Sequence, residues 1–195
     1  MWIRSRRAPV TIALMVINVA VFVVGYLTEN AIRELALVPV YLIEDPAMFA
    51  VSSLISMFLH ADIVHISFNM LALFTLGRFI EPYIGAAKYI IVYILSGYAG
   101  AGLHTAFAFV TESGINTPVV GASGAISGII GISAALGDRV AYYWIIAQIP
   151  FAIAFASVSP IAFFAHIGGF IFGFASGRII LYMQRKKERY DGYYV

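Results

Sequence analysis

The chain has 195 residues, of which 62% are hydrophobic and only 11% are charged, with a mean hydropathy of +0.91 and a formal net charge of +2. A soluble domain carries roughly 25% charged residues to form its polar surface, so this composition argues against a soluble enzyme, a disordered chain and a nucleic-acid-binding protein. The absence of cysteine excludes disulfides, thiolate metal ligands and a cysteine nucleophile.

Segments without Asp, Glu, Lys or Arg mark the candidate membrane helices, because a helix needs about 20 apolar residues to cross the hydrocarbon core. The first such segment extends to Thr28 and is longer than the core of a signal peptide, so we interpret it as a membrane span. The last is too long for one helix, and Ser157-Val158-Ser159-Pro160 favours a break within it. We predict an all-α membrane protein, a single domain over residues 1–195 with six transmembrane helices. They lie at roughly 8–28, 60–80, 88–111, 121–137, 140–157 and 160–182.

The basic residues predict the orientation of these helices. With six spans both termini lie on one side of the membrane, and every basic residue except Arg33 falls on that side. The positive-inside rule then places both termini in the cytoplasm. The basic residues assigned to the inner side are Arg4, Arg6, Arg7, Arg78, Lys88, Arg139, Arg178, Arg185, Lys186, Lys187 and Arg189.

The longest connection, from about Thr28 to Ser56, falls on the outer side. It contains Pro39 and Pro46 but is otherwise rich in apolar and aromatic residues. We therefore expect it to lie partly in the membrane interface rather than to form a free loop.

Several polar residues fall at membrane depth, where they are costly and usually face the protein interior or a water-filled cavity. His65 and Asn69 of span two are four residues apart and share a helix face. Ser123 opens span four between Gly121 and Gly124, and His166 lies near the start of span six. These three spans run from outside to inside, so we expect the polar side chains at one depth, in the outer half of the membrane.

Small residues predict that spans four and six are in contact. Span six presents Gly169, Gly173 and Gly177 in line with His166, and span four presents a similar stripe. Such faces let membrane helices approach closely, and if the two stripes meet, the serine lies against the histidine. The residues of the span-four stripe are Ser123, Ser127, Gly131 and Ala134, with Gly124 and Gly128 beside it.

This arrangement suits hydrolysis of a peptide bond. We predict Ser123 as the nucleophile and His166 as the general base and acid. The segments around them contain no Asp or Glu, so we expect a Ser-His dyad whose imidazole is oriented by packing and backbone contacts. The backbone N–H of Ser123 and the side chains of His65 and Asn69 are predicted to stabilise the oxyanion.

The remaining polar residues are assigned lesser roles. His60 lies about a turn and a half above His65 and either hydrates the site or bonds a loop carbonyl. The sequence predicts no metal site, because there is no HExxH motif and Asp62 is the lone acidic partner nearby; no cofactor is implied. We interpret Asp62 as a loop or cap residue, His104 as structural, and Glu81 as holding a loop through hydrogen bonds. Spans one and five contain little polar chemistry beyond Asn18 and Gln148.

Nearly the whole chain resembles the rhomboid family of intramembrane serine proteases. The resemblance rests on His65-xxx-Asn69, Gly121-x-Ser123-Gly124 and Ala165-His166-xx-Gly169 in that order, and on the stretches Met57–Met70 and Gly77–Gly85. It implies a rhomboid-like bundle and the same assignment of nucleophile, base and oxyanion donors. The supporting positions are His60, Gly121, Gly124, Gly169 and Gly173.

The resemblance also implies substrates and location. Rhomboid substrates are typically single-span membrane proteins that enter from the lipid and are cut in or near the membrane, with entry gated by span five or the loop after it. The bare six-helix form resembles prokaryotic members, which implies a prokaryotic cell membrane and an active site toward its outer side.

Two positions depart from the family pattern. Many members carry a bulky aromatic residue one turn after the serine, against the histidine ring, where this chain has Ser127. Many also carry a Trp-Arg pair in the first outer loop, which is absent around Val51-Ser52.

Two other functions remain open. One is a catalytically silent relative that binds membrane segments, although such relatives generally lose the serine or the histidine. The other is a small transporter or channel, which predicts repeated halves or a polar stripe across the full membrane depth.

Overall fold

The computed structural model describes residues 7–28, 34–155 and 162–191. Apart from an isolated bridge between Leu37 and Val119, the regular structure of these residues is helical, which confirms the predicted all-α fold class. The helices are α1 (Pro9–Leu27), α3 (Tyr41–Glu44), α4 (Pro46–Ser56), α5 (Ile63–Ile84), α6 (Ala86–Thr111), α7 (Ser123–Ala135), α8 (Arg139–Phe155) and α9 (Phe163–Asp191).

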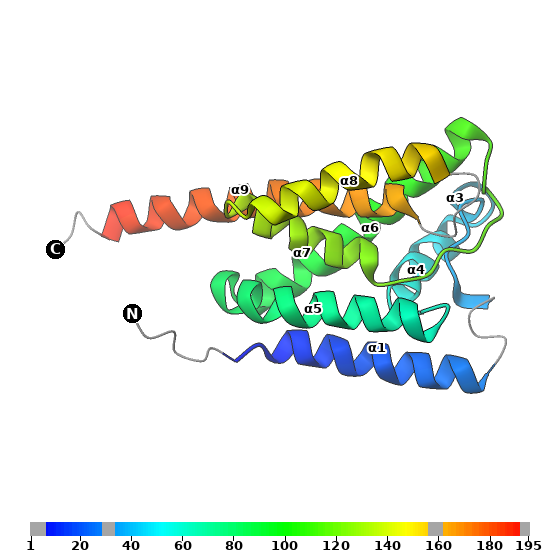
Figure 1. Ribbon diagram of the computed structural model, residues 1–195, viewed down its shortest axis with the longest axis horizontal. Helices are drawn as coiled ribbons and strands as arrows, with labels where there is room; N and C mark the ends of the chain where they lie inside the picture. The colour runs from blue at the N-terminus through cyan, green and yellow to red at the C-terminus, as the bar shows by residue number, and fades with distance from the viewer. Residues whose placement is uncertain (1–6, 29–33, 156–161, 192–195) are drawn as a thin grey trace.

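The long helices run alternately in opposite directions along one axis (Figure 1). The start of α1 and the end of α9 lie at the same end of the bundle, whereas α3 and α4 lie at the other (Figure 1). The central helix is α7, which contacts α5, α6, α8 and α9. A polar group at the start of α7 is therefore surrounded by protein rather than by lipid.

Four of the described helices are long and apolar enough to cross a membrane: Pro9–Leu27, Ile63–Ile84, Ala86–Thr111 and Phe163–Lys187. Helices α7 and α8 have 13 and 17 residues, which correspond to about 20 and 26 Å of helix. The count of six spans therefore stays a prediction. The expected break at 157–160 and the basic residues Arg4, Arg6 and Arg33 lie outside the described residues.

The second predicted span begins and ends later than expected. The Asp62 carboxylate accepts a hydrogen bond from the N–H of His65 at 2.8 Å and caps α5, so the helix starts at Ile63 rather than at residue 60. The helix continues through Pro82 and ends where Gly85 adopts a φ of +89°. The last helix also extends beyond its predicted end, to Asp191.

The first outer connection contains a helix with an unusual distribution of polarity. Ser52, Ser53 and Ser56 of α4 are buried in the protein, whereas Val51 and Leu54 are 51% and 37% exposed. A helix with serines inside and apolar side chains outside suits an apolar surrounding. This pattern supports the expectation that the connection lies in the membrane interface.

Glu81 of α5 connects α5 to α1 at the opposite end of the bundle. Its carboxylate accepts hydrogen bonds from the N–H groups of Val10 and Thr11, at 3.0 and 2.7 Å, and from the Thr11 hydroxyl at 2.8 Å. The α1 cap position, Ala8, offers no side-chain acceptor. Glu81 thus caps the N-terminus of a neighbouring helix, which corrects the expectation that it holds a loop.

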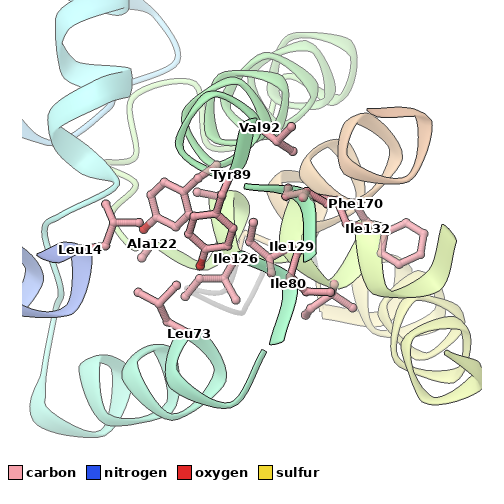
Figure 2. Packing of buried hydrophobic residues seen from close by; sticks show 14 of the residues in the cluster. Leu14, Leu73, Ile80, Tyr89, Val92, Ala122, Ile126, Ile129, Ile132 and Phe170 are labelled. Atoms are coloured by element: carbon pink, nitrogen blue, oxygen red, sulfur yellow. The ribbon is translucent and has the colours of Figure 1, made fainter. Parts of the chain in front are cut away.

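Above this junction the helices share one apolar core. Leu14 of α1, Leu73 of α5 and Ile126 of α7 converge around the fully buried ring of Tyr89 from α6 (Figure 2). Burial of apolar surface between helices here fixes α7 relative to α1, α5 and α6.

Helices α7 and α9 meet along the predicted small-residue faces. A β-carbon built on Gly169 would collide with the carbonyl of Gly124, and one built on Gly173 would collide with the carbonyl of Gly128. The two backbones therefore approach more closely than side chains permit. This close seam places the start of α9 against the start of α7.

Candidate active site

Ser123 is the first residue of α7 and is half-buried. Gly121 precedes it with a φ of +130°, and its N–H donates to the carbonyl of Ser56 in α4 at 2.9 Å. A β-carbon on Gly121 would lie 2.8 Å from Nε2 of His65. Glycine is required here both by the backbone conformation and by the imidazole beside it.

The structure brings Ser123 and His166 together. Nε2 of His166 lies 2.8 Å from Oγ of Ser123, although the two residues are 43 positions apart. The α7–α9 seam produces this contact, since both residues lie near the same end of their helices. The pair has the geometry that a general base needs to take the proton of a serine hydroxyl.

The second nitrogen of His166 contacts a residue that the sequence analysis placed among minor polar groups. Nδ1 lies 2.9 Å from Oε1 of Gln148, on α8. The imidazole was expected to be oriented by packing and backbone contacts rather than by a buried acid, and a side-chain amide has to be added to those contacts. The sequence does show an amide in an otherwise apolar span, but it does not show that this amide faces the histidine.

Aromatic rings surround the same imidazole. The centroid of Trp144, one turn before Gln148 on α8, lies 5.8 Å from that of His166, and Phe163 approaches edge-on at 6.3 Å. Phe170 packs against Trp144 rather than against the imidazole, with 6.5 Å between centroids. The aromatic contacts to the His166 ring therefore come from Phe163 of the same helix and from Trp144 of α8.

Ser127 is fully buried, and its hydroxyl donates to the carbonyl of Ser123 at 2.6 Å. It therefore bonds back to the preceding turn of its own helix. The aromatic ring that the family resemblance implies at this position is absent.

Of the predicted oxyanion residues, His65 lies against Gly121, two residues before the serine, and Asn69 follows one turn later on the same helix. The His65 ring contacts Gly121, as described above, and Asn69 is buried with its Nδ2 donating to the His65 carbonyl at 2.9 Å. The Asn69 amide carries a second N–H. The N–H groups in the first turn of α7 lack acceptors within their own helix, so the helix start directs donors toward the same region.

His60 packs against His65, with ring centroids 5.1 Å apart and the planes at 68°. It is 1% exposed, and neither of its ring nitrogens has a hydrogen-bond partner. Burial, with a smaller contribution from His65, lowers the pKa of His60 to about 4. The neutral ring therefore supports His65 by packing.

A small pocket adjoins Ser123 on the side of α4. It has a volume of about 30 Å³ and is bordered by Ser53, Ser56, Gly121 and Ser123, among others. The Ser53 hydroxyl is buried without a hydrogen-bond partner. A space of this size holds a water molecule, and the unpartnered hydroxyl offers a group to bind it.

Comparison with known proteins decides the family. The Rhomboid domain family matches residues 48–183, which include Ser123 and His166. The chain belongs to the rhomboid family. The match begins in α4 and ends within α9, so it contains every residue of the site described above.

Individual relatives agree with this assignment. This rhomboid is 33% identical over 135 residues to RHOMBOID-like protein 1 of Arabidopsis thaliana, covering 63% of this chain and 32% of that protein. It is 33% identical over 140 residues to Rhomboid-type serine protease 2 of Emericella nidulans, covering 66% and 26%. It is 34% identical over 125 residues to Rhomboid protease GluP of Bacillus subtilis, covering 60% and 23%. The matched region thus spans no more than a third of these relatives.

Proposed function

We propose that this rhomboid is an intramembrane serine endopeptidase in which Ser123 and His166 form the catalytic dyad. The observation that carries the proposal is the 2.8 Å contact between Nε2 of His166 and Oγ of Ser123 at the start of the buried helix α7. Two of the relatives are named as proteases, which supports the same reaction class.

The proposed chemistry proceeds through an acyl-enzyme. His166 takes the proton of the Ser123 hydroxyl as its oxygen attacks the scissile carbonyl, and then returns that proton to the leaving amine. Water, activated by the same imidazole, then hydrolyses the ester and regenerates the free serine. The pocket bordered by Ser53, Ser56 and Ser123 is proposed as the place from which that water approaches.

The oxyanion of each tetrahedral intermediate is assigned to three donors. These are the backbone N–H of Ser123, the His65 ring and the second N–H of Asn69. Each donor of this kind is worth about 3–4 kcal/mol of barrier when it is aimed at the developing charge. His60, Gly121, Gly124, Gly169 and Gly173 support this arrangement by packing.

The proposed membrane setting is supported by the direction of the helices. The start of α1 and the end of α9 lie at the same end of the bundle (Figure 1), and Lys88 and Arg139 lie in the first turns of α6 and α8. The positive-inside rule then assigns that end to the cytoplasm and Ser123 to the outer half of the membrane. Single-span membrane proteins are the proposed substrates, because they reach such a site sideways from the lipid.

A fluorophosphonate probe tests the proposal directly. Purified protein in detergent is expected to be labelled at Ser123 and to cut a model single-span substrate. Both activities are expected to fall at least about 1,000-fold in Ser123→Ala and His166→Ala. Ser67→Ala is the matched control, because this exposed α5 serine bonds only within its own helix, at 2.6 Å to the Ile63 carbonyl.

The possible outcomes separate the alternatives. Labelling by the probe without cleavage of the model substrate means that Ser123 is reactive but that this substrate is not recognised. Folded wild-type protein that reacts with neither probe nor substrate contradicts the proposal and favours the silent relative that binds membrane segments.

A further inference from the structure

His166 is held at both nitrogens by side chains from two other helices. Nε2 faces the Ser123 hydroxyl at 2.8 Å, and Nδ1 faces Oε1 of Gln148 at 2.9 Å. An amide oxygen accepts hydrogen bonds and cannot donate them. The Nδ1···Oε1 contact is a hydrogen bond in the tautomer that carries its proton on Nδ1, and that tautomer leaves a lone pair on Nε2 directed at Ser123. This is the tautomer that a general base requires.

The described acidic residues that make side-chain hydrogen bonds are engaged elsewhere. Asp62 caps α5, Glu81 caps α1, and Asp138 bonds the Ser133 hydroxyl and the N–H of Val140. Asp45 caps α4 through the N–H of Met48. Among the described residues, the amide of Gln148 is thus the side-chain acceptor that meets Nδ1.

The same helix also packs a ring against the imidazole. Trp144 and Gln148 are four residues apart, so they lie on one face of α8. That face directs an indole to within 5.8 Å of the His166 centroid and an amide oxygen to its Nδ1. Helix α7, by contrast, presents only the small Ser127, whose hydroxyl is bonded to its own helix.

We propose that Gln148 is a positioning residue for His166, held in place on a face of α8 that it shares with Trp144. This inference rests on the proposed function. It assigns to Gln148 the orienting role that a carboxylate has in a Ser-His-Asp triad. Its effect is both to fix the tautomer and to stabilise the imidazolium that forms when Nε2 takes the serine proton.

A neutral acceptor suits this place in the molecule. As the imidazole gains a proton, its Nδ1–H bond becomes charge-assisted and therefore stronger. Gln148 then favours the transition state over the resting enzyme, which raises turnover rather than substrate binding. A carboxylate would supply a stronger bond but would place a charge among apolar helices, which is costly without a permanent partner.

The test compares two substitutions at this position. Gln148→Met keeps the length and flexibility of the side chain but removes the acceptor, whereas Gln148→Glu keeps an acceptor oxygen. The control is Tyr143→Leu, which changes a residue of the same helix that is 68% exposed. Each variant is assayed for its rate of inactivation by the small fluorophosphonate and for kcat and KM with the single-span substrate.

We expect Gln148→Met to slow inactivation and to lower kcat by about 10- to 100-fold, the loss typical of a hydrogen bond to a charged group. KM should change less than about threefold, and Gln148→Glu should recover most of the lost rate. A role limited to packing or to substrate entry would leave the reaction with the small probe unaffected.

Three results overturn the inference. The first is Gln148→Met reacting with the probe at the wild-type rate. The second is an equal loss in the methionine and glutamate variants. The third needs no substitution: nitrogen NMR of histidine-labelled wild-type protein showing the His166 proton on Nε2. The failure of the proposed function looks different, because wild-type protein itself would then show no reaction at Ser123.

Discussion

Replacing Glu81 by alanine should destabilise the bundle without altering the chemistry. The carboxylate is 1% exposed and accepts three hydrogen bonds, of which the two from Thr11 are buried. Removing it leaves two N–H groups of the first turn of α1 and one hydroxyl without their acceptor. Hydrogen bonds to a charged group contribute about 1.5–3 kcal/mol each, and water at the helix start replaces part of the loss.

We therefore expect Glu81→Ala to lower the free energy of unfolding by about 3–5 kcal/mol. Glu81→Gln, which keeps one acceptor oxygen, should lose about half as much. Thr11→Val removes only the hydroxyl donor and should cost about 1 kcal/mol. Unfolding in micelles, followed by far-ultraviolet circular dichroism during titration with a denaturing detergent, measures each value.

The control for this series is Glu44→Ala, which removes an exposed carboxylate from α3 and should change stability by less than about 0.5 kcal/mol. Below the unfolding transition, the rate of reaction of Ser123 should be unchanged in all variants. A loss below about 1 kcal/mol in Glu81→Ala would show that water at the start of α1 satisfies those N–H groups as well as Glu81 does.

Two further predictions concern the seam and the buried histidine. Gly173→Ala places a β-carbon on the Gly128 carbonyl, so it should lower the free energy of unfolding by about 1–3 kcal/mol and also slow the reaction of Ser123. The control Gly102→Ala, whose β-carbon meets nothing within 4 Å, should be neutral or slightly stabilising. Equal effects of the two substitutions would refute close packing at the seam. His60 has a pKa of about 4 in the folded protein against 6.5 in the unfolded chain. As the pH falls from 6.5 toward 4, the unfolded chain binds a proton that the folded protein does not, so the folded protein loses stability relative to its value above pH 6.5. This loss amounts to about 3 kcal/mol, and denaturation curves of His60→Phe should lack it; an identical pH dependence in the variant would assign the loss to other groups.

The sequence was sufficient for the contact between α7 and α9, for a specific reason. The spacing of Gly169 and Gly173 has the period of a helix face, and a face of glycines in a membrane helix has few uses other than close packing. Because His166 continues that face, its approach to Ser123 followed from the same pattern. The backbone contacts of Gly124 and Gly128 now account for the pairing in detail.

Gln148 could not be placed in the same way. Its contact with His166 depends on the rotation of α8 about its own axis, and α8 carries no glycine stripe that fixes this rotation. Trp144 and Gln148 share a face, but apolar residues surround them on every side, so the sequence pattern does not show which face is buried. The role of Glu81 was missed for a related reason: the groups that donate hydrogen bonds to it lie about 70 positions away in sequence, and the signal was the absence of a capping side chain at Ala8.

The two ways in which His166 is held have different consequences for the proposed activity. Its backbone is fixed to that of Ser123 by glycine contacts that leave no room for adjustment, whereas its ring is oriented by two side chains from α8. A displacement of α8 therefore changes the tautomer and tilt of the imidazole while the α7–α9 seam stays closed. If substrate enters beside α8, as the resemblance to the family implies, its entry would act through Gln148 on the base that activates Ser123.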